Sequence, residues 1–186
     1  MELLRCSWCE KDDLYRTYHD TEWGKPVYDD KTIFEFLVLE SFQAGLSWYT
    51  ILKKRANFQL AFDDYNYKKI AEYPEQKVEE LMQNSGIIRN RLKILATINN
   101  AKRYMEVQKE FGDFSTYIWS FVGGKPLDNR FENLKQVPAT TEISDQIAKD
   151  LKKRGFKFLG STVVYAHMQA TGMVNDHVMD CWVRNQ

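Results

Sequence analysis

A single glutamate, Glu40, lies in the middle of an apolar stretch that runs from Ile33 to Trp48 and is predicted to form a buried helix. The spacing of Ile33, Leu37 and Glu40 places the acid on the same helix face as the apolar residues. Burial without a partner costs even a neutral polar group about 2–7 kcal/mol. The carboxylate is therefore either paired with a nearby arginine or tyrosine, or kept in place to bind a ligand.

Cysteine and histidine residues near both ends of the chain form a second group that is suited to chemistry. His177 and Cys181 are four residues apart, so on a helix their side chains would point the same way. Cys6 and His19 complete a two-sulfur, two-nitrogen set that Zn²⁺ prefers, with Cys9 as a rival to Cys6. Buried free thiols and satisfied core histidines are the alternative. Four protein ligands would close the tetrahedron, so such an ion would be structural and not that of a zinc hydrolase.

A third group surrounds a predicted turn between two amphipathic helices, near residues 76–105. Gly86 lets the backbone turn without a Cβ clash, and the following helix begins with free N–H groups that suit a phosphate. This is the shape of a helix-hairpin-helix element, whereas an ordinary helical hairpin with solvated basic residues is the alternative. The residues that we expect to bind DNA phosphates are Gly86, Ile88, Arg89, Arg91 and Lys93.

The elements that must position these groups are predicted to be helices almost throughout. Periodic apolar residues indicate helices over residues 31–44, 48–62, 75–84, 90–110, 114–122 and 159–171, and another between Thr141 and Gly155. Ser47 and Thr141 are expected N-caps. Residues 125–141 are polar and irregular, which indicates a surface loop. Sustained strand-type alternation is missing, so we expect an all-α fold that forms one unit over residues 1–186.

The composition excludes several classes of protein. Of the 186 residues, 44% are hydrophobic and 28% are charged, which is ordinary for one globular domain. Lys and Arg equal Asp and Glu at 26 each, so DNA binding would need a local basic patch. No apolar run approaches the ~20 residues of a membrane span, and no signal peptide is expected. Three cysteines do not make a disulfide framework, which predicts a cytoplasmic protein.

Five long motifs follow one another along the chain: YHDTEWG (residues 18–24), LESFQAGLSWYTILKKR (39–55), GIIRNRLKI (86–94), LKKRGFKFLGSTVVYAHMQATG (151–172) and VNDHVMDC (174–181). Together they resemble the bacterial 3-methyladenine DNA glycosylase I family, of the helix-hairpin-helix DNA repair superfamily. The resemblance covers nearly the whole chain. Cys9 and Phe42 depart from the family's pattern, and the aspartate that many superfamily members carry after the hairpin has no evident counterpart.

The resemblance implies a helical glycosylase bundle whose end segments, residues 1–24 and 174–186, are tied together by one structural Zn²⁺. The implied metal ligands are Cys6, His19, His177 and Cys181. The implied pocket for the extruded base consists of Glu40, Trp48, Tyr18, Trp8 and Tyr15, with the glutamate in contact with the methylated adenine. The implied partner is double-stranded DNA with alkylated bases, the implied product is free 3-methyladenine, and neither lyase activity nor an oligomer is expected.

The expected reaction gives Glu40 a physical role. 3-Methyladenine in DNA carries a positive charge that weakens its glycosidic bond, so the enzyme must mainly extract the base and bind it. Aromatic faces and a carboxylate favour a cationic purine over neutral adenine. We expect Glu40 to recognise the base first and to act as an electrostatic catalyst second. The alternatives are a non-catalytic zinc-stapled protein that binds damaged DNA, and a glycosylase of broader alkylpurine scope.

Overall fold

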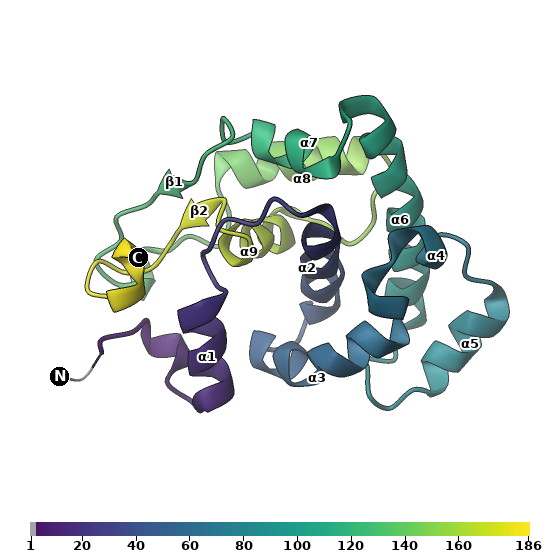
Figure 1. The fold of residues 1–186 in the computed structure, drawn as a ribbon, viewed down its shortest axis with the longest axis horizontal. Helices are drawn as coiled ribbons and strands as arrows, with labels where there is room; N and C mark the ends of the chain where they lie inside the picture. Colours follow the sequence, from purple (N-terminus) through teal and green to yellow (C-terminus); the bar gives the residue numbers. More distant parts are fainter. Residues whose placement is uncertain (1–2) are drawn as a thin grey trace.

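The computed structural model describes residues 3–186, and helices make up most of that part of the chain (Figure 1). The α-helices are α1 (Asp13–Thr21), α2 (Asp30–Gln43), α3 (Trp48–Ala61), α4 (Tyr67–Ile70), α5 (Glu75–Gln83), α6 (Arg91–Phe111), α7 (Phe114–Ser120), α8 (Glu142–Lys153) and α9 (Ser161–Ala170). Short 3-10 helices are η1 (Ser7–Cys9), η2 (Asp63–Tyr65), η3 (Leu134–Gln136) and η4 (Trp182–Asn185). The prediction of a mainly helical fold is confirmed.

One small pair of strands departs from the all-α prediction. β1 (Leu127–Asp128) runs parallel to β2 (Val174–Asn175), with Leu127 opposite Val174. The pair joins the segment after α7 to the C-terminal segment (Figure 1). Strands of two residues leave no alternating pattern in the sequence, which is why periodicity did not reveal them.

The predicted N-caps set the boundaries of two helices. The Ser47 hydroxyl accepts a hydrogen bond from the backbone N–H of Thr50 at 3.2 Å, which starts α3. At α8, Thr141 and Ser144 exchange side-chain and backbone hydrogen bonds in a reciprocal capping box. Each cap satisfies an N–H group that the first helical turn leaves without a partner.

Helix α2 forms the centre of the molecule and packs against α3, α6, α7 and α9. Nine of its fourteen residues are buried, and they lie on all sides of the helix. The prediction of a buried helix is confirmed, and its burial extends beyond the one face that Ile33, Leu37 and Glu40 share. Its central place explains why Glu40 is buried.

Helix α1 was not predicted, although it carries residues of two expected sites. Asp12 caps it by accepting a hydrogen bond from the backbone N–H of Tyr15 at 3.0 Å. Tyr18 and His19 are buried on this helix. The helix has only nine residues, and a helix this short is stabilised mainly by its packing against other segments.

His167 on α9 is a buried histidine whose ring is not satisfied by hydrogen bonds within residues 3–186. The side chain is buried, and neither ring nitrogen has a hydrogen-bond partner among the described residues. Burial disfavours the charged ring and lowers the pKa of His167 to about 3.

His167→Phe is therefore expected to raise the free energy of unfolding at neutral pH by about 1–3 kcal/mol, because it removes polar atoms that are buried without partners. Between pH 6.5 and about 3 the unfolded chain binds a proton at His167 that the folded chain does not. The free energy of unfolding of the wild type therefore decreases as the pH is lowered through this window. Urea unfolding at pH 7 and pH 5 should show a larger advantage of the variant at pH 5. An equal or smaller advantage at pH 5 would contradict the assignment.

Candidate functional site

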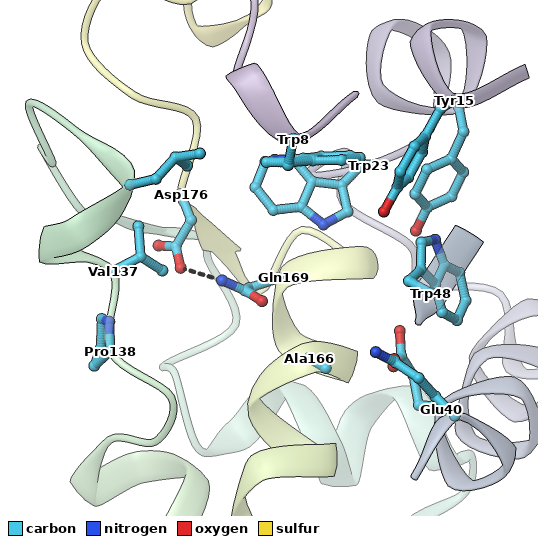
Figure 2. Close-up of a pocket in the computed structure, with 13 residues that line it drawn as sticks. Trp8, Tyr15, Trp23, Glu40, Trp48, Val137, Pro138, Ala166, Gln169 and Asp176 are labelled. Carbon is cyan, nitrogen blue, oxygen red and sulfur yellow. Dashed lines mark hydrogen bonds between the residues drawn. The ribbon is translucent and has the colours of Figure 1, made fainter. Parts of the chain in front are cut away.

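A cavity of about 340 Å³ lies among α1, α2, α9 and the η3 segment (Figure 2). The structure brings together around it all five residues that were predicted for base binding, namely Trp8, Tyr15, Tyr18, Glu40 and Trp48. They come from four separate elements: η1, α1, α2 and α3. Cavities that are lined by apolar and aromatic side chains with a few polar groups are typical small-molecule sites.

Glu40 is the acidic group on one side of this cavity. Its side chain is buried, and its Oε2 atom has no hydrogen-bond partner among the described residues. Arg55 on α3 contacts Glu35 and Glu22, each at 2.7 Å, and not Glu40. Burial without a compensating charge raises the pKa of Glu40 to about 8. The alternative in which Glu40 serves a structural ion pair does not describe this molecule.

Trp48 supplies an unpaired donor in the same cavity. Its indole Nε1 is buried and has no hydrogen-bond partner among residues 3–186. The ring lies 5.6 Å from the ring of Tyr18 and 6.3 Å from that of Phe36. An unpaired donor and an unpaired acceptor between aromatic faces suit a flat heterocycle that carries an amino group and ring nitrogens.

Further aromatic side chains fix the other wall of the cavity. Trp8 contacts Tyr15 and Trp23 edge to face, with ring centroids 4.9 and 5.1 Å apart. Trp23 lies within the motif YHDTEWG, yet it was not singled out as a pocket residue. Because the rings hold one another, the wall is arranged before any ligand binds.

Two further parts of the cavity were missed. Leu134, Val137 and Pro138 line it from the segment that was predicted to be a free surface loop. Gln169 and Asp176 line it as well, and Gln169 donates to Asp176 at 2.8 Å (Figure 2). The loop prediction is corrected accordingly: residues 134–138 form a wall of the pocket.

Phe42, which departs from the family's pattern, lies away from the cavity. It is fully buried in the core and packs edge to face on Phe58, with ring centroids 4.9 Å apart. It is not among the residues that line the cavity in the described part of the chain. Its effect on a ligand would have to pass through the backbone of α2.

Cys6, His19, His177 and Cys181 form a buried cluster whose ligand atoms all lie within 4.8 Å of one another. The His177 Nδ1 atom lies 3.7 Å from the Cys6 sulfur and 3.4 Å from the Cys181 sulfur. The Cys181 sulfur lies 3.5 Å from the His19 Nε2 atom. A tetrahedral zinc site with bonds of about 2.0–2.3 Å separates sulfur from nitrogen by roughly 3.5 Å, so the cluster fits this ion.

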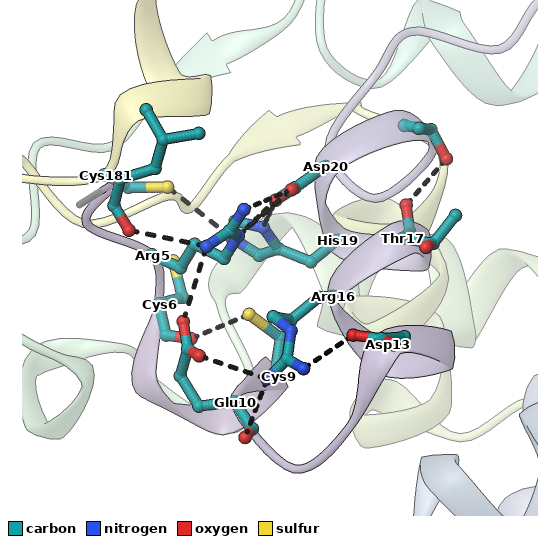
Figure 3. Close-up of polar contacts among 12 residues, drawn as sticks. Arg5, Cys6, Cys9, Glu10, Asp13, Arg16, Thr17, His19, Asp20 and Cys181 are labelled. Atoms are coloured by element: carbon teal, nitrogen blue, oxygen red, sulfur yellow. Dashed lines mark hydrogen bonds and ion pairs between the residues drawn. The ribbon is translucent and has the colours of Figure 1, made fainter. Parts of the chain in front are cut away.

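Hydrogen bonds to groups outside the cluster orient both histidine rings. The His19 Nδ1 atom lies 2.8 Å from Asp20, which Arg5 contacts in turn at 2.9 Å (Figure 3). The His177 Nε2 atom lies 3.0 Å from the carbonyl oxygen of Trp23. Partners of this kind select which ring nitrogen faces a metal.

The structure distinguishes Cys6 from Cys9 and shows the backbone conformation between His177 and Cys181. Cys9 lies outside it, and its sulfur contacts the carbonyl oxygen of Cys6 at 3.1 Å, so Cys6 is the ligand candidate of the two. His177 and Cys181 were expected on a helix, and this is wrong because they flank a turn. The Cys181 N–H donates to the carbonyl of Val178 at 2.9 Å, which brings the two side chains together without a helix.

The predicted helical hairpin exists as α5, a turn and α6, but two of its residues have other roles than expected. Gly86 does not have a positive φ; a Cβ atom there would lie 2.9 Å from the Asn84 side chain and 3.1 Å from that of Asn57. Glycine is thus needed for close packing on α3. Lys93 is buried, and its ammonium donates to the carbonyls of Phe42 and Ala44 at 3.0 and 3.3 Å. Its assignment to phosphate binding is corrected, because it caps the C-terminus of α2.

The other basic residues of the hairpin are accessible. Arg89 is exposed in the turn before α6. Arg91 is half-buried and forms ion pairs with Glu79 at 2.5 Å and with Glu75.

Within residues 3–186, none of the helices is long and apolar enough to pass through a lipid bilayer.

Comparisons with known proteins agree with this geometry. A family model described as methyladenine glycosylase matches residues 8–185. DNA-3-methyladenine glycosylase 1 of Escherichia coli (strain K12) is 48% identical over 177 residues, which are 95% of each chain. DNA-3-methyladenine glycosylase of Haemophilus influenzae is also 48% identical over 177 residues, 95% of this chain and 96% of the relative.

Solved structures are similar over nearly their full length. A crystal structure of a 3-methyladenine DNA glycosylase I has a TM-score of 0.92 at 47% identity, with 96% of this chain and 98% of that chain covered. The Staphylococcus aureus 3-methyladenine DNA glycosylase I, solved to explain its recognition of 3-methyladenine, has a TM-score of 0.95 at 39% identity. The match covers 98% of this chain and 97% of that one.

Proposed function

The chain belongs to the methyladenine glycosylase family, and from this premise we propose that it removes 3-methyladenine from DNA by hydrolysing the N-glycosidic bond of the damaged nucleotide. The observation that carries the proposal is the unpaired, buried carboxylate of Glu40 in an aromatic cavity. An isolated buried acid is costly to the fold, and binding of a cationic base would offset this cost.

Recognition of the base rests on charge and stacking. The exocyclic amine of 3-methyladenine donates to Glu40, while the rings of the cavity stack on the purine faces. Because burial raises the pKa of Glu40 to about 8, a cationic base favours the ionised carboxylate and neutral adenine does not. The pocket therefore discriminates between the two bases through electrostatics.

The reaction needs little acid catalysis. The bond between C1′ and the purine nitrogen breaks, its electron pair neutralises the base cation, and water adds to the sugar cation that forms. A lyase step would require an amine nucleophile. None of the residues that line the cavity in residues 3–186 is a lysine, which supports a monofunctional hydrolase.

We also propose that the Cys₂His₂ cluster binds one Zn²⁺ through Cys6, His19, His177 and Cys181. With four protein ligands the ion has no open position for substrate or water, so its contribution is to the structure. The cluster ties the segment that carries α1 to the C-terminal segment. No step of the reaction passes through it.

The DNA partner is proposed to be a duplex that contains alkylated bases, bound by one copy of the chain in the cytoplasm. Arg89 and the N-terminal N–H groups of α6 can hold a backbone phosphate. Leu46, 40% exposed at the turn between α2 and α3, is suited to fill the gap that the flipped base leaves. It lies in sequence between the pocket residues Gln43 and Trp48.

Arg89→Ala is expected to weaken DNA binding and to leave the affinity for free 3-methyladenine unchanged. The slope of the logarithm of the DNA-binding constant against the logarithm of the salt concentration should become smaller in magnitude by about 1. Arg91→Ala is the matched comparison, and a smaller loss is expected because Arg91 is engaged by Glu75 and Glu79. Fluorescence titration of a labelled duplex at several salt concentrations measures both. Equal DNA binding by Arg89→Ala and the wild type would refute the phosphate contact.

The proposed function is tested by the profile of bases that the protein releases from methylated double-stranded DNA. Free 3-methyladenine is the expected product, with no strand cleavage. Binding of methylated DNA without release would favour the alternative of a non-catalytic damage-binding protein. Release of methylated guanines as well would favour the broader glycosylase.

A further inference from the structure

The cavity contains a second buried carboxylate, Asp176, which the function described above does not use. Its exposed fraction is 1%, and it lines the cavity on the side opposite Glu40 and Trp48 (Figure 2). Near it are Val137 and Pro138, which are half-exposed and belong to the outer wall of the cavity (Figure 2). The two acids thus lie at different ends of one site.

Three neutral donors hold this carboxylate in place. Tyr165 and Gln169 donate to its Oδ2 atom at 2.7 and 2.8 Å, and Asn129 donates to its Oδ1 atom at 2.8 Å. All three donors are uncharged, so they orient the carboxylate without neutralising its charge. A carboxylate offers about four lone-pair positions, so the three donors do not use up its capacity to accept hydrogen bonds.

The backbone around Asp176 is fixed as well. Asp176 directly follows β2 and Asn129 directly follows β1, so the strand pair sets the distance between them. A hydrogen bond fixes the backbone of Gln169 as well, because its carbonyl oxygen accepts from the N–H of Gly24 at 3.1 Å. The charge is therefore positioned before any ligand binds, as electrostatic stabilisation of a transition state requires.

We propose that Asp176 is a catalytic residue of the glycosylase reaction, which faces the deoxyribose, stabilises its developing positive charge and orients the attacking water. The proposal depends on the function proposed above. If the base occupies the end of the cavity with Glu40 and Trp48, the sugar attached to it extends toward the other end, where Asp176 lies. The two acids then divide the work, as carboxylates in different environments commonly do.

The bonds in this step balance. The C1′–N bond breaks with both electrons moving to the base, which becomes neutral, and C1′ becomes part of an oxocarbenium-like sugar. A water molecule that donates a hydrogen bond to Asp176 attacks C1′ through its oxygen, and its proton leaves to solvent. The products are free 3-methyladenine and an abasic sugar with a hydroxyl at C1′. No oxidant, metal or other reactant is needed.

The test is Asp176→Asn, which removes the charge and nearly preserves the shape. The single-turnover rate of 3-methyladenine release is expected to fall about 10- to 100-fold, as is typical when one electrostatic group of an active site is removed. The affinity for free 3-methyladenine and the metal content are expected to stay as in the wild type. The melting temperature is expected to fall, because the new amide has only one oxygen to accept from Asn129, Tyr165 and Gln169. A purely structural role would change affinity and rate together.

Asp180→Asn is the matched control. Asp180 precedes Cys181 as Asp176 precedes His177, but it is exposed and lies outside the cavity, so its release rate should equal that of the wild type. If Asp176→Asn loses its metal, Asp176→Ser, which keeps a hydroxyl for the neighbouring donors, replaces it in the same assays. A wild-type rate for the variant, or a rate that falls only in proportion to base affinity, would overturn the proposal. Failure of the wild type to release any base would instead overturn the proposed function.

Discussion

Glu40→Gln is expected to slow release of 3-methyladenine by about 10- to 100-fold and to weaken binding of the free base, because a charge-assisted hydrogen bond contributes about 1.5–3 kcal/mol. The amide keeps an oxygen that can accept a hydrogen bond but loses the charge that favours a cation. The measurements are single-turnover release from methylated DNA and titration with 3-methyladenine.

The control is Glu35→Gln on the same helix. Glu35 pairs with Arg55 at 2.7 Å and does not line the cavity, so this variant should lose some stability and keep release and binding. If Glu40→Gln releases the base as fast as the wild type, the selection by charge is contradicted.

Stability gives an independent check on Glu40. The pKa of its carboxyl is raised from 4.5 to about 8 in the folded chain, so above pH 4.5 the unfolded state loses this proton more readily. The contribution of Glu40 to the free energy of unfolding is therefore present below pH 4.5 and is lost as pH rises through about 8. Glu40→Gln should gain on the wild type across this window in urea unfolding.

Cys181→Ser is expected to abolish metal binding and to lower the melting temperature, because a structural metal contributes directly to the free energy of folding. It should also impair base binding. Trp8, Tyr18 and Trp23 line the cavity and lie within four residues of the candidate ligands Cys6 and His19. Loss of the cluster therefore loosens one wall of the pocket, while the helical core around α2 remains folded.

Metal content, thermal unfolding and titration with 3-methyladenine measure these effects, and Cys9→Ser is the matched control. Cys9 is buried close to Cys6 but lies outside the cluster, so its replacement should preserve the metal. A Cys181→Ser protein with the wild-type metal content and melting temperature would refute the cluster as a metal site.

The local signals in the sequence predicted most of the helices. Ser47 and Thr141 cap the helices that they were expected to cap, since a cap depends on the side chain and the N–H groups three residues later. The long helix predicted over residues 90–110 is observed as Arg91–Phe111. The five motifs, through the family resemblance that they carry, predicted the five aromatic and acidic residues that surround one cavity.

The errors come from contacts between residues that are far apart in the chain. Lys93 was assigned to phosphate because basic residues flank it, whereas its acceptors lie 49 and 51 residues away at the end of α2. Gly86 was explained by its own turn, whereas Asn57 on α3 imposes the requirement. Asp176 was not singled out in the sequence, because nothing local indicates that Asn129, Tyr165 and Gln169 hold it in the pocket.

The most direct test of the central claim is a crystal structure of this protein with 3-methyladenine bound. The base is expected in the cavity, stacked on the aromatic side chains, with its exocyclic amine within hydrogen-bond distance of the Glu40 carboxylate. A base bound elsewhere, or a Glu40 side chain turned into an ion pair with the protein, would contradict the account.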